Sequence, residues 1–195
     1  MTEQELVQRF VGTFEAMKPI LQDSYKGFFT NNSALLKNCT ERFNKMHKTV
    51  LPYMEKLFAE KEKDAVELKY VNLVLAFQPI ALAIDNLISK MLVKVESNIL
   101  FSDKAVNEIK TLLQIAYDQC RDTKDYLLTK NPNLKENVIA AKEKLTALVI
   151  DYDVIHQNRL IAGVCMPKAS YLYIDFTHSI RRISKGLADF AEKIE

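Results

Sequence analysis

Glycine and proline are scarce in this chain of 195 residues, which has four glycines and five prolines. Tight turns depend on these two residue types, so their scarcity excludes β-sandwiches, barrels and doubly wound sheets. The same lack excludes the glycine-rich loops that hold phosphates or nucleotides, and the Gly-x-Ser-x-Gly turn of many hydrolases. We therefore expect a protein that is not an enzyme and holds no cofactor.

Cysteine and net charge are also low. Cys39, Cys120 and Cys165 are odd in number and far apart, whereas a disulfide framework has an even, denser set and a zinc site has close pairs. We expect free, mostly buried thiols in the reducing cytoplasm. The net charge is +2, from 27 basic and 25 acidic residues. This balance gives no basic excess for binding nucleic acid.

Long apolar runs are missing as well. The longest uncharged run, residues 70–84, contains Asn72, Gln78 and Pro79 and is too short to cross a bilayer. Residues 1–14 alternate charged and apolar side chains and lack the apolar core of a signal peptide. The sequence therefore predicts a cytoplasmic protein without membrane insertion.

Apolar residues recur at spacings of three and four along nearly the whole chain, which is the period of an amphipathic helix. The last part shows the pattern in Leu172, Phe176, Ile180, Ile183, Leu187, Phe190 and Ile194. The breaks between such segments carry capping residues, and Gly163 is placed where a helix ends in a left-handed residue. We expect helices over residues 2–29, 34–60, 64–98, 103–129, 133–162 and 167–194, with a kink at Pro79 in the third.

The order of these segments, three helices, a short connection and three more helices, indicates an internal duplication. Residues of the third predicted helix match residues of the sixth at a constant offset, namely Ile80, Ala83 and Leu87 with Ile183, Gly186 and Phe190. We expect an all-α protein of six long antiparallel helices. They would form two side-by-side three-helix bundles, residues 1–99 and 100–195, within one compact unit.

A distinctive order of residues precedes and enters the last helix, consisting of His156, Arg159-Leu160, Gly163, Cys165, Pro167, Ala169, Leu172-Tyr173 and Asp175. This order resembles the PhoU-like cytosolic domain at the C-terminus of bacterial sodium/phosphate cotransporters. Residues 101–105 are similar to the same family's entry into its fourth helix. The resemblance covers residues 66–194, and the first 60 residues share only the helix pattern. It implies two three-helix bundles and a context of phosphate transport or phosphate signalling.

The resemblance breaks down at the family's metal motif. PhoU-like proteins carry a Glu-x-x-x-Asp pair on the third helix of each half, and these carboxylates bind iron or zinc. The matching positions here are Gln78 and Leu82 in the first half and Arg181 and Lys185 in the second, with Gly186 in place of histidine. Neutral and cationic side chains cannot replace the hydration shell of a metal cation. We therefore expect no metal site.

Cations replace those carboxylates on the last helix. His178, Arg181, Arg182 and Lys185 lie within two turns of each other, and we call them the cation row. Such a row could contact an anion, such as phosphate, or the acidic surface of a partner. The alternative is an ordinary solvated helix face, because most charge runs on helices are only that.

The function that these observations predict is binding. We expect a regulatory or adaptor protein of the PhoU-like kind that docks on the cytoplasmic face of a phosphate transporter or on a sensor protein. The alternatives are an anion-sensing helical bundle and a helical scaffold with no phosphate role. His156 and Arg159 lie near a helix end, where cations are common, so we expect them to be structural. A homodimer would cover the side faces of the long helices.

Overall fold

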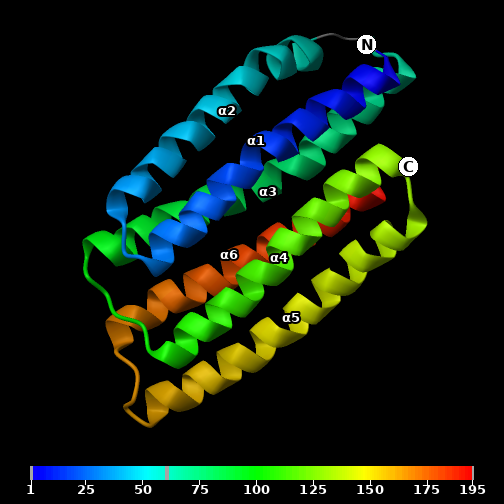
Figure 1. Cartoon of the computed structure of the whole chain (residues 1–195). Coiled ribbons are helices and arrows are strands. Elements are labelled where there is room, and N and C mark those ends of the chain that lie inside the picture. Colours follow the sequence, from blue (N-terminus) through cyan, green and yellow to red (C-terminus); the bar gives the residue numbers. More distant parts are fainter. Residues whose placement is uncertain (1, 60–61, 195) are drawn as a thin grey trace.

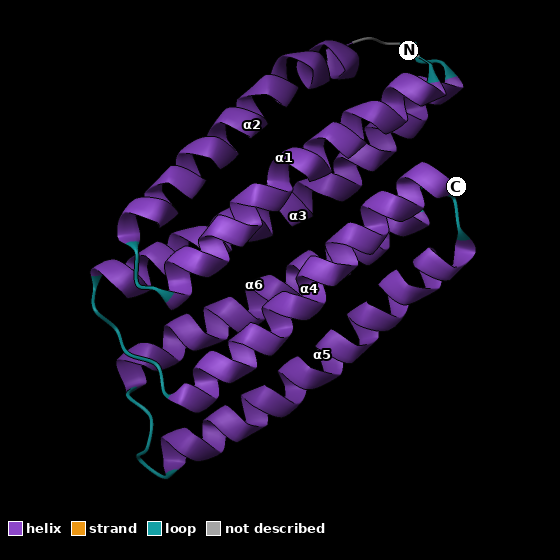
Figure 2. Cartoon of the chain, in the orientation of Figure 1, coloured by secondary structure: helices purple, strands orange, loops and turns teal. Residues whose placement is uncertain are grey.

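Six antiparallel helices make up the computed structural model, which describes residues 2–59 and 62–194 (Figure 1). The helices are α1 (Glu3–Phe29), α2 (Ser33–Ala59), α3 (Ala65–Glu96), α4 (Asp103–Thr129), α5 (Pro132–Ile161) and α6 (Pro167–Glu192). The connections at residues 30–32, 97–102, 130–131 and 162–166 are short, and the described part of the chain contains no strand (Figure 2). The predicted all-α architecture is confirmed, and the predicted helix boundaries match the observed ones to within two residues. The predicted end of the second helix, residue 60, lies outside the described residues.

Side chains at the helix starts explain several of these boundaries. The Thr2 hydroxyl accepts from the backbone N–H of Glu5, whose carboxylate accepts from the Thr2 N–H, and Asp64 and Glu67 make the same reciprocal pair before α3. Gly163 follows α5 with a φ of +69°, as its position predicted. These contacts satisfy backbone groups that would otherwise lack partners at the helix ends.

The helices form two three-helix bundles side by side. α1, α2 and α3 pack together, α4, α5 and α6 pack together, and the bundles meet where α3 packs on α6 and α1 on α4. α2 and α5 therefore lie at the outer edges of the molecule (Figure 1). The predicted boundary between residues 99 and 100 falls in the connection between α3 and α4.

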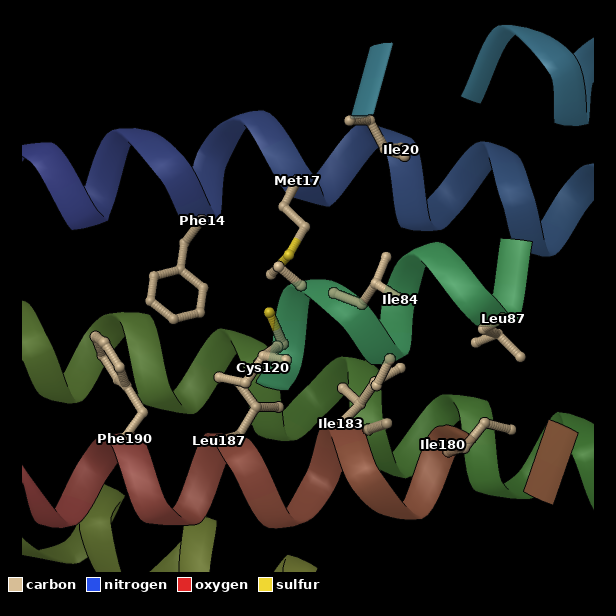
Figure 3. Close-up of a cluster of buried hydrophobic side chains, with 14 of the residues drawn as sticks. Phe14, Met17, Ile20, Ile84, Leu87, Cys120, Ile180, Ile183, Leu187 and Phe190 are labelled. Carbon is tan, nitrogen blue, oxygen red and sulfur yellow. The ribbon is translucent and has the colours of Figure 1, made fainter. Parts of the chain in front are cut away.

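The core runs through the seam between the bundles. Figure 3 shows side chains from α1, α3, α4 and α6 meeting there, among them Phe14, Ile84, Cys120 and Leu187. α3 runs unbroken through Pro79 and is, among the described helices, the one long and apolar enough to cross a membrane by length and composition. Its packing on α1, α2 and α6 accounts for part of this apolar composition, since 39% of its most apolar stretch is buried.

Gly186 lets α3 and α6 approach closely. A Cβ atom added at this position would lie 2.6 Å from Cγ1 of Ile80 on α3. We expect Gly186→Ala to lower the free energy of unfolding by about 1–2 kcal/mol, because overpacking outweighs the gain in helix propensity. Urea denaturation followed by circular dichroism measures the change. Gly12→Ala is the matched control: no atom lies within 4 Å of its added Cβ, so stability should not fall, and a fall of equal size would contradict the packing argument.

Candidate functional site

One side of the α3–α6 layer is left uncovered. In the described part of the chain, the backbone of α3 lies next to α1, α2 and α6, and that of α6 lies next to α3, α4 and α5. Phe176 and Phe190 of α6 also contact aromatic rings of α1, on the inner side of this layer. The two helices are held in register by a hydrogen bond of 2.7 Å from Asn86 to Ser179 and an ion pair of 2.9 Å between Lys90 and Asp175. Exposed residues of both helices therefore share one surface. We call it the outer face, and its members are Leu75, Leu82 and Val93 of α3 and Tyr171, Arg182 and Lys185 of α6.

Large apolar side chains are unusually exposed on this outer face. Leu82 is 71% exposed and Tyr171 is 78% exposed. Single exposed apolar residues are normal on soluble proteins, but a row of them beside cations is a common feature of binding surfaces. The outer face is therefore a candidate contact surface.

The structure splits the predicted cation row. His178 turns toward α5, where its Nε2 lies 3.2 Å from a carboxylate oxygen of Asp153. Lys185 lies 2.9 Å from the carboxylate of Asp189, one turn further along α6. Arg181 and Arg182 form no side-chain hydrogen bond or ion pair with any residue that the structure describes. Two of the four cations thus have acidic partners within the chain, and the two arginines are the ones available to an external anion.

The positions that match the family's metal motif lie at the protein surface. Gln78, Leu82 and Lys185 are exposed, and Arg181 is partly exposed. Within residues 2–59 and 62–194, no group of three or more His, Cys, Asp or Glu side chains could hold a metal ion. The positions that the resemblance assigns to the metal motif therefore lie on an accessible surface, and their side chains are neutral or cationic.

A largely buried polar cluster joins the three helices of the second bundle. The guanidinium of Arg159 on α5 donates two hydrogen bonds of 2.7 Å to the carboxylate of Glu108 on α4. The hydroxyl of Tyr173 on α6 donates to the same carboxylate at 2.5 Å. The side chains of Arg159 and Glu108 are 11% and 12% exposed. The hydrogen bonds that Arg159 donates to Glu108 raise the pKa of Arg159, and burial raises the pKa of Tyr173. The cluster is therefore a charge-assisted clamp between α4, α5 and α6.

His156 extends this cluster. Its ring stacks on Tyr173 with the ring centres 4.5 Å apart, and its Nε2 lies 2.7 Å from the Ser170 hydroxyl. A histidine that contacts a serine hydroxyl can act as the general base that activates a nucleophilic serine. Ser170 is only 7% exposed, however, and Nδ1 of His156 has no hydrogen-bond partner among the described residues that would orient the ring. The arrangement fits the structural role that we expected for His156 and Arg159.

The environment of His156 predicts a pH dependence of stability. Burial, and next the charge of Arg159, lower its pKa from the ordinary value of 6.5. Below that pH the unfolded chain binds a proton that the folded chain does not, so folding loses free energy as the pH falls, by up to about 1.4 kcal/mol per pH unit. We expect the unfolding free energy to fall with acidification from pH 6.5.

Denaturation curves measured across this pH range test the expectation. His156→Gln should flatten the slope of stability against pH, whatever its effect at neutral pH. His47→Gln is the matched control, because His47 is exposed on α2. Slopes that are the same in the wild type and in His156→Gln would show that His156 does not carry the effect.

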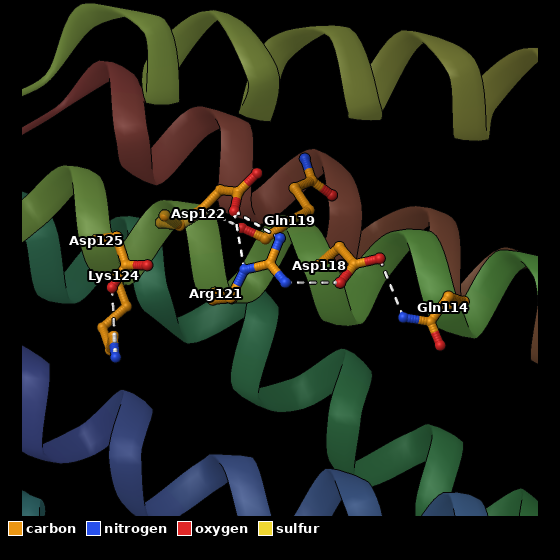
Figure 4. A network of polar contacts seen from close by, with 8 residues as sticks. Gln114, Asp118, Gln119, Arg121, Asp122, Lys124 and Asp125 are labelled. Carbon is orange, nitrogen blue, oxygen red and sulfur yellow. Dashed lines mark hydrogen bonds and ion pairs between the residues drawn. The ribbon is translucent and has the colours of Figure 1, made fainter.

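A second polar network lies along α4 (Figure 4). The side-chain amide of Gln119 is 1% exposed and donates to the backbone carbonyls of Val138 on α5, at 2.8 Å, and Ser184 on α6, at 3.0 Å. The nearby Arg121 pairs with Asp118 and Asp122 at the surface. Exposed pairs of this kind contribute little to stability. Gln119 therefore ties the second bundle together, and the charges around it form an ordinary solvated face.

The three cysteines are free thiols, as the sequence predicted. Cys39 and Cys120 are buried, and Cys165 is partly exposed in the turn before α6. Burial raises the pKa of the Cys120 thiol to about 12, so this thiol stays protonated at neutral pH. Cys120 therefore acts as a small apolar side chain in the seam.

Comparison with known proteins bears on the fold. No protein-family model matches the chain, and no curated protein sequence matches it. The crystal structure of PhoU from Pseudomonas aeruginosa superposes with a TM-score of 0.80 at 11% sequence identity, covering 98% of this chain and 94% of that one. At this identity the likeness concerns the fold. The chain has a PhoU-like fold, with both three-helix bundles represented.

Proposed function

We propose that this chain is a non-enzymatic regulatory or adaptor protein of phosphate transport or phosphate signalling, which acts in the cytoplasm by binding another protein. Its fold is that of a PhoU, and the order of residues from His156 to Asp175 resembles the cytosolic domain of sodium/phosphate cotransporters. The observation that carries the proposal is the outer face, where exposed leucines lie on the same surface as Arg182. Arg182, like the adjacent Arg181, has no acidic partner among the described residues.

The partner that fits this surface has an acidic patch beside an apolar one. Arg181 and Arg182 would form charge-assisted hydrogen bonds with carboxylates, while Leu82 and Tyr171 would enter apolar pockets. We propose that the partner is the cytoplasmic face of a phosphate transporter, with a phosphate sensor protein as the alternative. Contact through a surface of this kind needs neither a metal nor a cofactor in this chain.

Site-specific cross-linking tests this proposal. A benzophenone amino acid at position 82, irradiated in cells of the source organism, should form a cross-link to a subunit of a phosphate transporter or to a phosphate sensor. Arg181→Glu/Arg182→Glu should abolish that cross-link, because it places carboxylates against carboxylates. The matched control is Lys104→Glu/Lys110→Glu, an equal change of charge at two exposed positions of α4, which should leave the cross-link intact.

The alternatives give different outcomes. A helical scaffold without a phosphate role would cross-link only to proteins unrelated to phosphate. An anion sensor would bind inorganic phosphate or polyphosphate directly, as the two free guanidinium groups would allow, and titration calorimetry would show heat that Arg181→Glu removes. A symmetric cross-link between two copies of the chain would place a homodimer on this face instead. Each of these results would contradict docking on a transporter or sensor.

A further inference from the structure

An apolar groove lies between the two bundles, on the side of the α3–α6 layer opposite the outer face. Its floor is formed by Ile84 and Leu87 of α3 and Ile183 and Leu187 of α6, and its walls include Met17 of α1 and Cys120 of α4. Figure 3 shows these side chains converging from the four helices. The groove encloses about 320 Å³. The groove is open to solvent on one side, and its volume lies at the lower end of the range typical of small-molecule sites.

Uncharged polar groups border the mouth of the groove. Gln22 on α1 donates a hydrogen bond of 2.9 Å to the hydroxyl of Tyr117 on α4, and this bond crosses from one bundle to the other. Tyr25 and Gln114 lie on the same border. None of the described residues that line the groove is charged. The Cys120 thiol on its wall stays protonated because burial raises its pKa to about 12.

We infer that this groove binds a neutral amphipathic molecule with a single apolar tail. The tail would lie on the floor between α3 and α6, and a hydroxyl or carbonyl head group would replace the hydrogen bond between Gln22 and Tyr117. A neutral head group fits this border better than a charged one, because no residue of the lining offers an opposite charge to pair with it.

The size of the groove limits the tail. An engineered cavity of about 150 Å³ in another protein takes up benzene, so a space of about twice that volume accepts a chain of roughly ten carbons. Pockets of this size with an apolar lining and a few polar groups at the edge are typical small-molecule sites. Because the lining comes from both bundles, an occupant would contact α1, α3, α4 and α6 at once. Binding would therefore stabilise the interface between the bundles and raise the melting temperature.

Dye displacement with the full-length protein tests this inference. The neutral fluorophore N-phenyl-1-naphthylamine should show saturable fluorescence enhancement, and 1-decanol should displace it. Decanoate and decyltrimethylammonium have the same tail length but carry opposite charges, and each should require at least about a tenfold higher concentration. The melting temperature should rise with 1-decanol and should not rise with the charged compounds.

Ala116→Phe places a phenyl ring in the groove, because Ala116 lines it and is 7% exposed. Dye affinity should fall at least about tenfold in this variant. Ala140→Phe makes the same change at an exposed position of α5 and should leave the affinity unchanged. Crystals of the wild type soaked in 10-bromo-1-decanol give an independent readout, because anomalous bromine density should lie between α1 and α4.

Three results would overturn the inference. The first is an absence of both saturable dye binding and bromine density. The second is equal competition by neutral and charged compounds, which would indicate unspecific uptake. The third is dye binding that Ala116→Phe and Ala140→Phe change to the same extent. None of these outcomes depends on the proposed role in phosphate transport.

Discussion

Replacing Arg159 by leucine is expected to lower the free energy of unfolding by up to about 3–5 kcal/mol, because it breaks a largely buried ion pair from one side. The substitution leaves the carboxylate of Glu108 buried between α4, α5 and α6 without the two hydrogen bonds of 2.7 Å that Arg159 donates. Tyr173 would remain as its hydrogen-bond donor. A neutral hydroxyl stabilises a buried charge much less than a bidentate guanidinium does.

A double-mutant cycle separates the loss of the pair from the loss of packing. Glu108→Leu/Arg159→Leu removes both charges and should be more stable than Arg159→Leu alone, because no unpaired charge stays buried. Arg121→Leu is the control, since Arg121 has a side chain that is 55% exposed in its pairs with Asp118 and Asp122. Arg121→Leu should lower the free energy of unfolding by less than about 1 kcal/mol. Equal losses for Arg121→Leu and Arg159→Leu, measured by urea denaturation, would show that the buried cluster is not a clamp.

This cluster also shows what the sequence could not predict. The order of residues from His156 to Tyr173 marked Arg159 and Tyr173, but Glu108 lies 51 residues before Arg159 and carries no local signal. Which carboxylate meets Arg159 depends on how α4 packs on α5 and α6. The same holds for His178, whose partner Asp153 lies on the preceding helix. Spacing along one helix predicted the cation row, whereas the pairing of its members depends on neighbouring helices.

The helices themselves were predictable because their signals are local. Apolar spacing of three and four residues marks a helix wherever one face is buried, and capping residues mark its start. Among the boundaries that differ, the start of α5 does so for a reason that is also local: α5 begins at Pro132, not at residue 133, with Asn131 as its cap. Proline fits the first helical position because its missing N–H would have no helical partner there. The groove between the bundles had no such signal, since it arises where side chains from four helices fail to fill a shared space.

Ile180→Asp tests the seam that holds the two bundles together, and we expect it to unfold the protein at ambient temperature. Ile180 is 0% exposed on α6 (Figure 3). An aspartate there would bury a carboxylate without a partner and remove apolar contacts, each at a cost of several kcal/mol. The free energy of unfolding of a small protein is only about 5–15 kcal/mol, so the sum of these two costs approaches the whole stability of the fold.

Ile150→Asp makes the same chemical change at a surface position, since Ile150 is 53% exposed on α5. Ile150→Asp should change the free energy of unfolding by no more than about 0.5 kcal/mol, as most surface substitutions do. Far-UV circular dichroism should show loss of helix in Ile180→Asp and an unchanged spectrum and melting temperature in Ile150→Asp. If Ile180→Asp kept the wild-type melting temperature, α6 could not pack as described, because no partner for a charge at position 180 exists among the apolar side chains of the seam. Both isoleucines lie in helices, and they differ in whether their side chains face the core or the solvent. Comparing the two substitutions therefore tests whether the apolar spacing marks the buried face of each helix.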